Sequence, residues 1–261
     1  MASSYLMSEM TSPEVEEALK RTDIVLFPVG SMEQHATHLP LNNDIFTSFE
    51  ISKRVAERLA PEILLLVAPP LPFGISPHHM GFPGTLSLQI ETFIEAVKDV
   101  CRSLGSHGFR NILIVNGHGG NTDALRIATH EIAGEISARV YLVEWWDLVP
   151  DVIVKLFTAP FYHACETETS MVLALDQRVD VPKAKSSVPP ESSRFVKHDF
   201  MATGPKVYEP LMDMRTLTQT GAVGDPTKAS AEKGKELLDA VLERFANFIK
   251  ELRTARGVSP P

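Results

Sequence analysis

The sequence predicts an α/β fold with a mainly parallel central sheet flanked by helices. Short apolar runs alternate along the chain with segments in which apolar residues recur at helical spacing. Glycine and proline close most of these segments, as they do at turns between strands and helices. Because neither an internal repeat nor a linker-like stretch divides the chain, we expect a single domain over residues 1–261.

Each expected element follows from its local pattern. Apolar runs predict strands at residues 23–30, 62–70, the start of 111–121, and 138–146. Helical spacing predicts helices at residues 44–60, 89–107, Asn121 to about 133, 165–175 and 229–253. The Pro- and Gly-rich loop at 69–85 is long enough to indicate a functional loop. Residues from about 180 to 227 have weak periodicity and are expected to be loop-rich, and the tail at about 255–261 is expected to be disordered.

Composition narrows the class of protein. The formal net charge of −8 argues against general binding to nucleic acid or to an acidic membrane, because both need a basic surface. The sequence has no apolar stretch near the roughly 20 residues of a membrane span and no secretory signal pattern. Two cysteines do not suggest a disulfide framework. We therefore expect a cytoplasmic protein.

The first group of candidate ligands follows the strand at 23–30. If the chain stays extended, Glu33 and His35 point to the same side, and Asp44 returns at the start of the next helix. Carboxylate and imidazole together suit zinc, manganese or ferrous iron. The alternative is a solvated polar loop, which these three residues do not exclude.

The second group is the segment NGHGGN at 116–121. His118 follows an apolar strand, and Gly119 and Gly120 let a ligand approach the main chain closely. The alternatives are a plain strand-to-helix turn and a phosphate-binding loop. The spacing fits neither of the common phosphate-loop patterns, and a central histidine suits metal coordination better.

The third group is HACETETS at 163–170. On a helix His163 and Glu166 would share a face, whereas Glu168 would lie on a different face and support neighbouring structure. A buried glutamate needs a partner, and a metal ion would be one. The alternatives are a charged helix start and a Cys165–His163 nucleophile pair, which adjacent helix positions disfavour.

Each of the three groups is expected at the end of a different predicted strand. The carboxyl ends of parallel strands are where α/β sheets bind ligands. Together the groups contribute five candidate ligands, namely Glu33, His35, Asp44, His118 and Glu166. That number exceeds what a single catalytic zinc normally takes, so the sequence predicts two metal ions. His78 and His79 in the long loop are either substrate contacts or ordinary exposed histidines, and one of Trp145 and Trp146 at a strand end could line the pocket while the other belongs to the core.

Six segments in a fixed order carry a resemblance to a known family. They are PVGSMEQHATHLPLNND, MGFPGTLSL, NGHGGN, WWD, HACETETS and GDPTKASAEKG, and they extend over nearly the whole chain. On these motifs the sequence resembles the creatininase family, the creatinine amidohydrolase-like metal hydrolases. The resemblance implies an α/β domain with a binuclear zinc, manganese or iron site, hydrolysis of a C–N amide bond of a small molecule, and a homohexamer.

The resemblance also implies roles for individual residues. Glu33, Asp44 and His118 would hold one metal, and His35, Asp44 and Glu166 the other, with Asp44 bridging. His163 matches the family's proton-transfer histidine, with Glu166 beside it. The residues expected at the substrate are Trp146, His79, Gly119, Gly120 and Tyr162.

Two departures separate the chain from creatininase proper. Gly120 stands where creatininases have a glutamate, which Glu166 is expected to replace, and Ala159 stands in place of a second tryptophan. These departures indicate the branch with GHGGN and HAxExETS motifs and weigh against creatinine, so a cyclic amide or a formamide is expected. The alternatives are a peptidase that trims a peptide-derived cofactor precursor and a non-catalytic member that binds metal or ligand.

Overall fold

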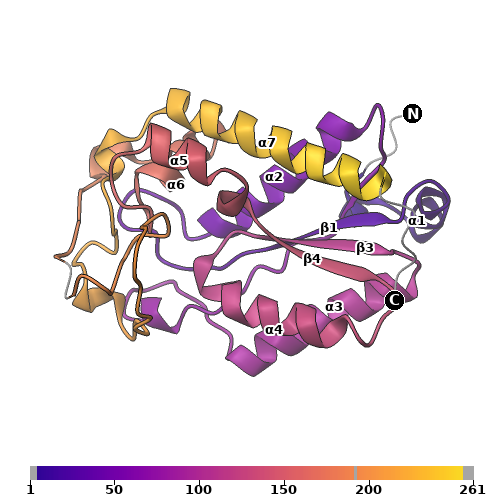
Figure 1. Cartoon of the computed structure of the whole chain (residues 1–261), viewed down its shortest axis with the longest axis horizontal. Coiled ribbons are helices and arrows are strands. Elements are labelled where there is room, and N and C mark those ends of the chain that lie inside the picture. Colours follow the sequence, from indigo (N-terminus) through magenta and orange to yellow (C-terminus); the bar gives the residue numbers. More distant parts are fainter. Residues whose placement is uncertain (1–4, 191–192, 255–261) are drawn as a thin grey trace.

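The central sheet is parallel throughout. The computed structural model describes residues 5–190 and 193–254, and within them four strands form one sheet in the order β2-β1-β3-β4. Strands β1, β3 and β4 lie side by side in Figure 1. The strands are β1 Ile24–Val29, β2 Leu66–Val67, β3 Asn111–Asn116 and β4 Arg139–Glu144. In the register, Leu26 of β1 lies beside Leu113 of β3, which lies beside Tyr141 of β4. The predicted mainly parallel α/β sheet is confirmed.

Helices cover both faces of this sheet. Helices α2 (Asn43–Leu59) and α7 (Ala231–Thr254) lie on one face, and α3 (Ile90–Ser106) and α4 (Thr122–Ile132) lie on the other (Figure 1). Successive residues of a strand point to opposite faces, so Leu26 packs in the cluster with α2 and α7, and Phe27 in the cluster with α3 and α4. Burial on both faces explains why β1 is apolar along its whole length.

Three further helices complete the described chain. They are α1 Ser12–Leu19, α5 Pro150–Leu156 and α6 Glu166–Ala174, of which α6 packs against α7. The sequence analysis did not predict α1 or α5, although each has Pro near its first turn and α1 has a Thr11–Glu14 capping box. Both are short, so their apolar periodicity is weak.

Other differences are small. The strand predicted at 62–70 forms only at Leu66–Val67, and the segment from about 180 to 227 is loop-rich as predicted, with short 3-10 turns. The tail at about 255–261, predicted to be disordered, lies outside the described residues. Within the described residues, no helix combines the length and the apolar character that crossing a membrane requires.

The topology brings distant segments of the chain together. Because β1, β3 and β4 run in one direction, the segments that follow them begin at one edge of the sheet. These segments start at Gly30, Gly117 and Trp145, and they carry the polar residues predicted from sequence.

Candidate metal centre

Four predicted ligands meet at this edge of the sheet. His35 Nε2 lies 2.9 Å from Asp44 Oδ1, and His118 Nδ1 lies 3.2 Å from Asp44 Oδ2. His118 Nε2 lies 3.3 Å from Glu33 Oε2. All four side chains are buried, although they come from the loop after β1, the first turn of α2 and the loop after β3. A solvated loop is therefore excluded for this group.

The local backbone explains how the group forms. Ala36 adopts a left-handed conformation with φ of 55°, and the loop folds back so that Glu33 N–H donates to Leu41 O at 3.0 Å. That turn brings Asp44 back over Glu33 and His35. On the β3 side, a Cβ atom at Gly117 would lie 2.2 Å from Asp44 O, so only glycine permits this approach to α2.

Six side chains form three overlapping groups that could hold metal ions. In each group, one nitrogen or oxygen per residue lies within 4.8 Å of the others. The groups are Glu33 with Asp44 and His118, His35 with Asp44 and Glu168, and Glu33 with His35 and His163. Since Asp44 belongs to the first two, these two groups describe neighbouring ion positions that share one carboxylate.

Glu166, a predicted ligand, lies outside these three groups. Its carboxylate accepts a hydrogen bond from Lys233 Nζ at 2.5 Å and one from Thr158 N–H at 3.4 Å. The prediction placed His163 and Glu166 on one helical face, but α6 begins at Glu166, and Ala164 before it has a left-handed φ of 46°. Glu168, which was assigned to a different face, is the α6 carboxylate that faces His35 and Asp44.

Gly120 leaves no room for a carboxylate of its own. A Cβ atom there would lie 2.3 Å from His118 Nε2 and 2.6 Å from Ile75 O. A glutamate at this position would therefore displace His118 in the present packing. The acid that completes the second group comes from α6.

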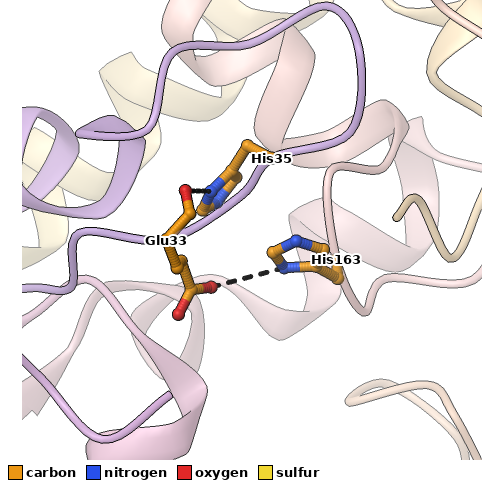
Figure 2. A group of neighbouring side chains, drawn as sticks. All are labelled: Glu33, His35 and His163. Carbon is orange, nitrogen blue, oxygen red and sulfur yellow. Dashed lines mark hydrogen bonds and ion pairs between the residues drawn. The ribbon is translucent and has the colours of Figure 1, made fainter. Parts of the chain in front are cut away.

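His163 lies beside Glu33 and His35 (Figure 2). Its Nδ1 is 3.6 Å from Glu33 Oε1, and its ring centroid is 4.5 Å from that of His35. His163 thus adjoins the predicted ligands, as expected for a proton-transfer residue, and its position also permits coordination.

His79 reaches the same carboxylate from the long loop. Its Nε2 lies 3.4 Å from Glu33 Oε1, and the residue is only 1% exposed. The neighbouring His78 stacks against His118 with ring centroids 6.1 Å apart. Both loop histidines therefore lie at the centre, and the prediction that His79 contacts substrate stays a prediction.

The charges in the group depend on one another. Burial disfavours protonation of both histidines, but the carboxylates outweigh it, and the pKa rises to about 10 for His35 and about 9 for His118. Burial raises the pKa of Glu33, and desolvation raises that of Glu168 to about 7. The buried carboxylates of Glu33, Asp44 and Glu168 therefore need positive charge close by.

The donor atoms fit divalent metal ions. Glu33 Oε1, His35 Nε2 and Asp44 Oδ2 are buried, and the imidazoles and carboxylates near them are not aligned for hydrogen bonds. Unpaired lone pairs of this kind in a closed group are costly unless a cation takes them. Mixed carboxylate and imidazole ligands suit zinc, manganese and iron.

An aromatic cluster lies next to the candidate metal ligands. The rings of Trp146 and Phe200 stack with centroids 5.9 Å apart, and Tyr162 stacks on Phe200 at 5.4 Å. A Cβ atom at Gly119 would lie 2.6 Å from the Phe200 ring, which places Phe200 beside the residue that follows His118. The predicted substrate residues Trp146, Tyr162 and Gly119 therefore share one region.

Sequence reasoning missed several residues of the centre. Ser76 hydrogen-bonds to Glu33 and lies 3.2 Å from His118 Nε2, and no motif marked it. Phe200 comes from the loop-rich segment, where periodicity gives no position. Gln34 contacts both His79 and His163, and its place between Glu33 and His35 was the only signal that could have found it.

The chain matches known proteins along most of its length. It is 31% identical to the creatinine amidohydrolase of Pseudomonas putida, over 96% of this chain and 98% of that protein. It is 30% identical to the 3-dehydro-scyllo-inosose hydrolase of Thermotoga maritima, over 97% and 85%. A mycofactocin precursor peptide peptidase of Mycolicibacterium smegmatis is 31% identical over 90% and 87%.

Solved structures agree with the sequence matches. A creatininase mutant described as Zn-Zn type superposes with a TM-score of 0.77 at 29% identity and full coverage of both chains. A manganese creatininase superposes with a TM-score of 0.78 at 29% identity over 99% and 100%. The family model for creatinine amidohydrolase matches residues 8–249. The chain therefore belongs to the creatininase family.

Proposed function

We propose that this chain is a metal-dependent amidohydrolase that cleaves a C–N amide bond, in a cyclic amide or a formamide, of a small molecule. The observation that carries the proposal is the pair of neighbouring ligand groups that share Asp44. The family supports hydrolysis, since two of the relatives above are hydrolases of small molecules.

The proposed ligand sets follow the geometry. Glu33, Asp44 and His118 would hold one divalent ion, and His35, Asp44 and Glu168 the other. Zinc and manganese are the first metals to test because related structures are described with them, and iron suits the same ligands. When bound, such ions activate water as a nucleophile and polarise a carbonyl oxygen.

The surrounding residues supply the remaining chemistry. His163 would accept a proton from the attacking water and return it to the departing nitrogen, because its Nδ1 faces the ligands. The buried residues around the candidate ligands keep bulk water out, and the packed ends of the strands hold the ligands in place. The stacked rings of Trp146 and Phe200 favour a flat substrate group next to Gly119.

Metal content and turnover test the proposal together. Purified protein loaded with zinc or manganese should hold about two ions per chain, and Glu33→Ala or His118→Ala should remove at least the ion that Glu33, Asp44 and His118 would hold. Turnover should be assayed with creatinine, cyclic amides, formamides, oxidised inositols and short peptides. A wild-type chain that cannot be loaded with metal would refute the proposal.

A peptidase is the second candidate, because a relative of similar identity is a peptidase. Cleavage of peptides without cleavage of small amides would favour it. His163→Ala separates both enzymes from a non-catalytic binder: an enzyme should lose turnover and keep its metal, whereas a binder has no turnover to lose.

Gly120 supports a branch distinct from creatininase proper, since a glutamate does not fit there.

A further inference from the structure

Gln34 lies buried between Glu33 and His35, and its amide contacts groups outside the ligand set. Gln34 Nε2 donates to Gly221 O at 3.2 Å, and Gln34 Oε1 accepts from Ala36 N–H at 2.9 Å. A carbonyl only accepts and a backbone N–H only donates, so exchanging the amide oxygen and nitrogen would break both bonds. The orientation of the Gln34 amide is therefore fixed.

The amide nitrogen also adjoins two histidines. Gln34 Nε2 lies 2.7 Å from His79 Nδ1 and 3.0 Å from His163 Nε2. With Gly221 O, three neighbours compete for two hydrogens. The histidine protons decide which neighbour receives none.

The backbone of Gln34 settles the proton of His163. His163 Nε2 lies 2.8 Å from Gln34 O, which only accepts, so Nε2 carries a hydrogen and donates it. A protonated Nε2 cannot accept from the amide. The two amide hydrogens therefore go to His79 Nδ1 and Gly221 O.

Opposite functional groups then face one carboxylate oxygen. His79 Nδ1 accepts from the amide, so the proton of His79 is on Nε2, 3.4 Å from Glu33 Oε1. His163 has its proton on Nε2, so its Nδ1 is free to take a proton, 3.6 Å from the same oxygen. The two rings lie 4.3 Å apart between centroids.

We infer that Gln34 is a positioning residue that holds His79 as a hydrogen-bond donor and His163 as a proton acceptor at the metal centre. The side chain acts on His79 and the backbone carbonyl acts on His163. The use of these positions in turnover rests on the proposed hydrolysis, whereas the hydrogen positions themselves do not.

Nitrogen NMR of histidine tests the hydrogen positions directly. Zinc-loaded protein labelled with ¹⁵N-histidine should show His79 and His163 each with the proton on Nε2. His79→Gln and His163→Gln assign the signals, since each removes one ring from the nine in the chain. A proton on Nδ1 of His79, or an Nε2 of His163 without one, would overturn the inference.

Two variants of Gln34 test its effect. Gln34→Glu places acceptors at His79 Nδ1 and should move the His79 proton to Nδ1. Gln34→Met removes the donor and should leave His79 exchanging between tautomers. His163 should keep its signals in both variants because the backbone carbonyl remains. If Gln34→Glu does not fold, Gln34→Met and the wild type still decide the question.

The control is Thr85→Val, which removes the acceptor of the Gln34 backbone N–H at 3.1 Å and leaves the amide untouched. Gln34→Glu should lower kcat by about 10- to 100-fold with unchanged metal content, as loss of a supporting partner does. Thr85→Val should leave the His79 signals as in wild type.

His79 signals that are the same in wild type and both Gln34 variants would contradict the inference. A metal-loaded wild type without any turnover would refute the proposed hydrolysis and leave the NMR result valid.

Discussion

Glu166 and Glu168 lie two residues apart on α6, and their carboxylates have different partners. Glu168 faces His35 and Asp44, so Glu168→Gln should weaken the ion position that these residues share. We expect about one of two ions to be lost on dialysis, measured by elemental analysis of the variant and of wild type. Retention of both ions after dialysis would exclude Glu168 as a ligand.

The matched control is Glu166→Gln. It should keep both ions, because the Glu166 carboxylate pairs with Lys233 outside the ligand groups. It should instead lower the free energy of unfolding by about 1–3 kcal/mol, since a partly buried hydrogen-bonded charge is lost. Loss of metal in this variant together with normal stability would contradict the assignment.

Cys101 and Cys165 are free thiols that lie fully buried, so neither is accessible as a nucleophile. Burial raises the pKa of the Cys101 thiol to about 12, so almost none is thiolate at pH 8. We expect iodoacetamide to leave both residues unmodified in the folded protein at pH 8 and to modify both in guanidinium, as read by mass spectrometry. Rapid modification of Cys165 in the folded state would revive a Cys165–His163 pair.

At the scale of elements, helices α6 and α7 cross at Gly234. A Cβ atom there would lie 1.8 Å from Ser170 O, so the two helices approach more closely than any side chain permits. Gly234→Ala should therefore destabilise the fold by about 1–3 kcal/mol through overpacking, although alanine is the better helix former. Urea unfolding measures the change.

Lys235→Ala on the same helix is the control for that variant. Lys235 is exposed and pairs with Asp239 one turn away, so its loss should change the unfolding free energy by at most about 0.5 kcal/mol. Equal stability of Gly234→Ala and wild type would show that α6 and α7 can move apart without cost.

The sequence predicted those elements whose pattern is long or strongly apolar. Burial on both faces makes β1 apolar throughout, and α3 repeats apolar residues over its whole length, so both were predicted. The prediction that His163 and Glu166 share a helical face failed, because spacing gives a helical face only if the start of the helix is known. α6 begins after His163, and the left-handed Ala164 that separates them has no clear sequence signal.

The centre was predicted in part for the same reason. Glu33, His35, Asp44 and His118 follow strands or begin a helix, so the topology of a parallel sheet brings them together. Ser76 and Phe200 come from loops whose paths depend on tertiary packing. No periodic pattern specifies such positions.

At the scale of the whole molecule, the segment between α6 and α7 exposes large apolar side chains. They are Val181, Val188, Phe200, Val207, Tyr208 and Met212. We propose that these side chains contribute to contacts between copies of the chain, because contiguous exposed apolar surface marks such contacts. We expect the homohexamer that family resemblance implies, measured as native mass in units of the 28.8 kDa chain.

Substitutions on this surface test its part in assembly. Tyr208→Glu with Met212→Glu should produce smaller species, because these residues are 83% and 79% exposed in the isolated chain. Val154→Glu on α5 is the control, since Val154 is exposed outside the segment. A wild-type chain that is monomeric at micromolar concentration would contradict the expected hexamer.

Metal removal should destabilise the whole fold. Without ions, Glu33 and Asp44 remain buried, and the groups near Glu33 Oε1 and Asp44 Oδ2 are not aligned for hydrogen bonds. Ions at 100-fold above their dissociation constant stabilise a native state by about 2.7 kcal/mol. For a chain of this size, we expect chelation to lower the unfolding temperature by roughly 5–10 °C, and zinc or manganese to restore it.

A variant with one weakened ion position separates this effect from damage by the chelator. Glu33→Gln removes a ligand charge from the group with Asp44 and His118 and leaves the group of His35, Asp44 and Glu168 intact, so chelation should lower its unfolding temperature less than that of wild type. The carboxylates of Asp44 and Glu168 remain in that variant, and any direct action of the chelator on the fold would still appear. Chelated wild type could lose its ions, as shown by elemental analysis, and still unfold at the unchanged temperature. In that case His35 and His118, whose pKa values are raised, neutralise these carboxylates as well as metal does. The centre would then contribute to catalysis without contributing to the stability of the fold.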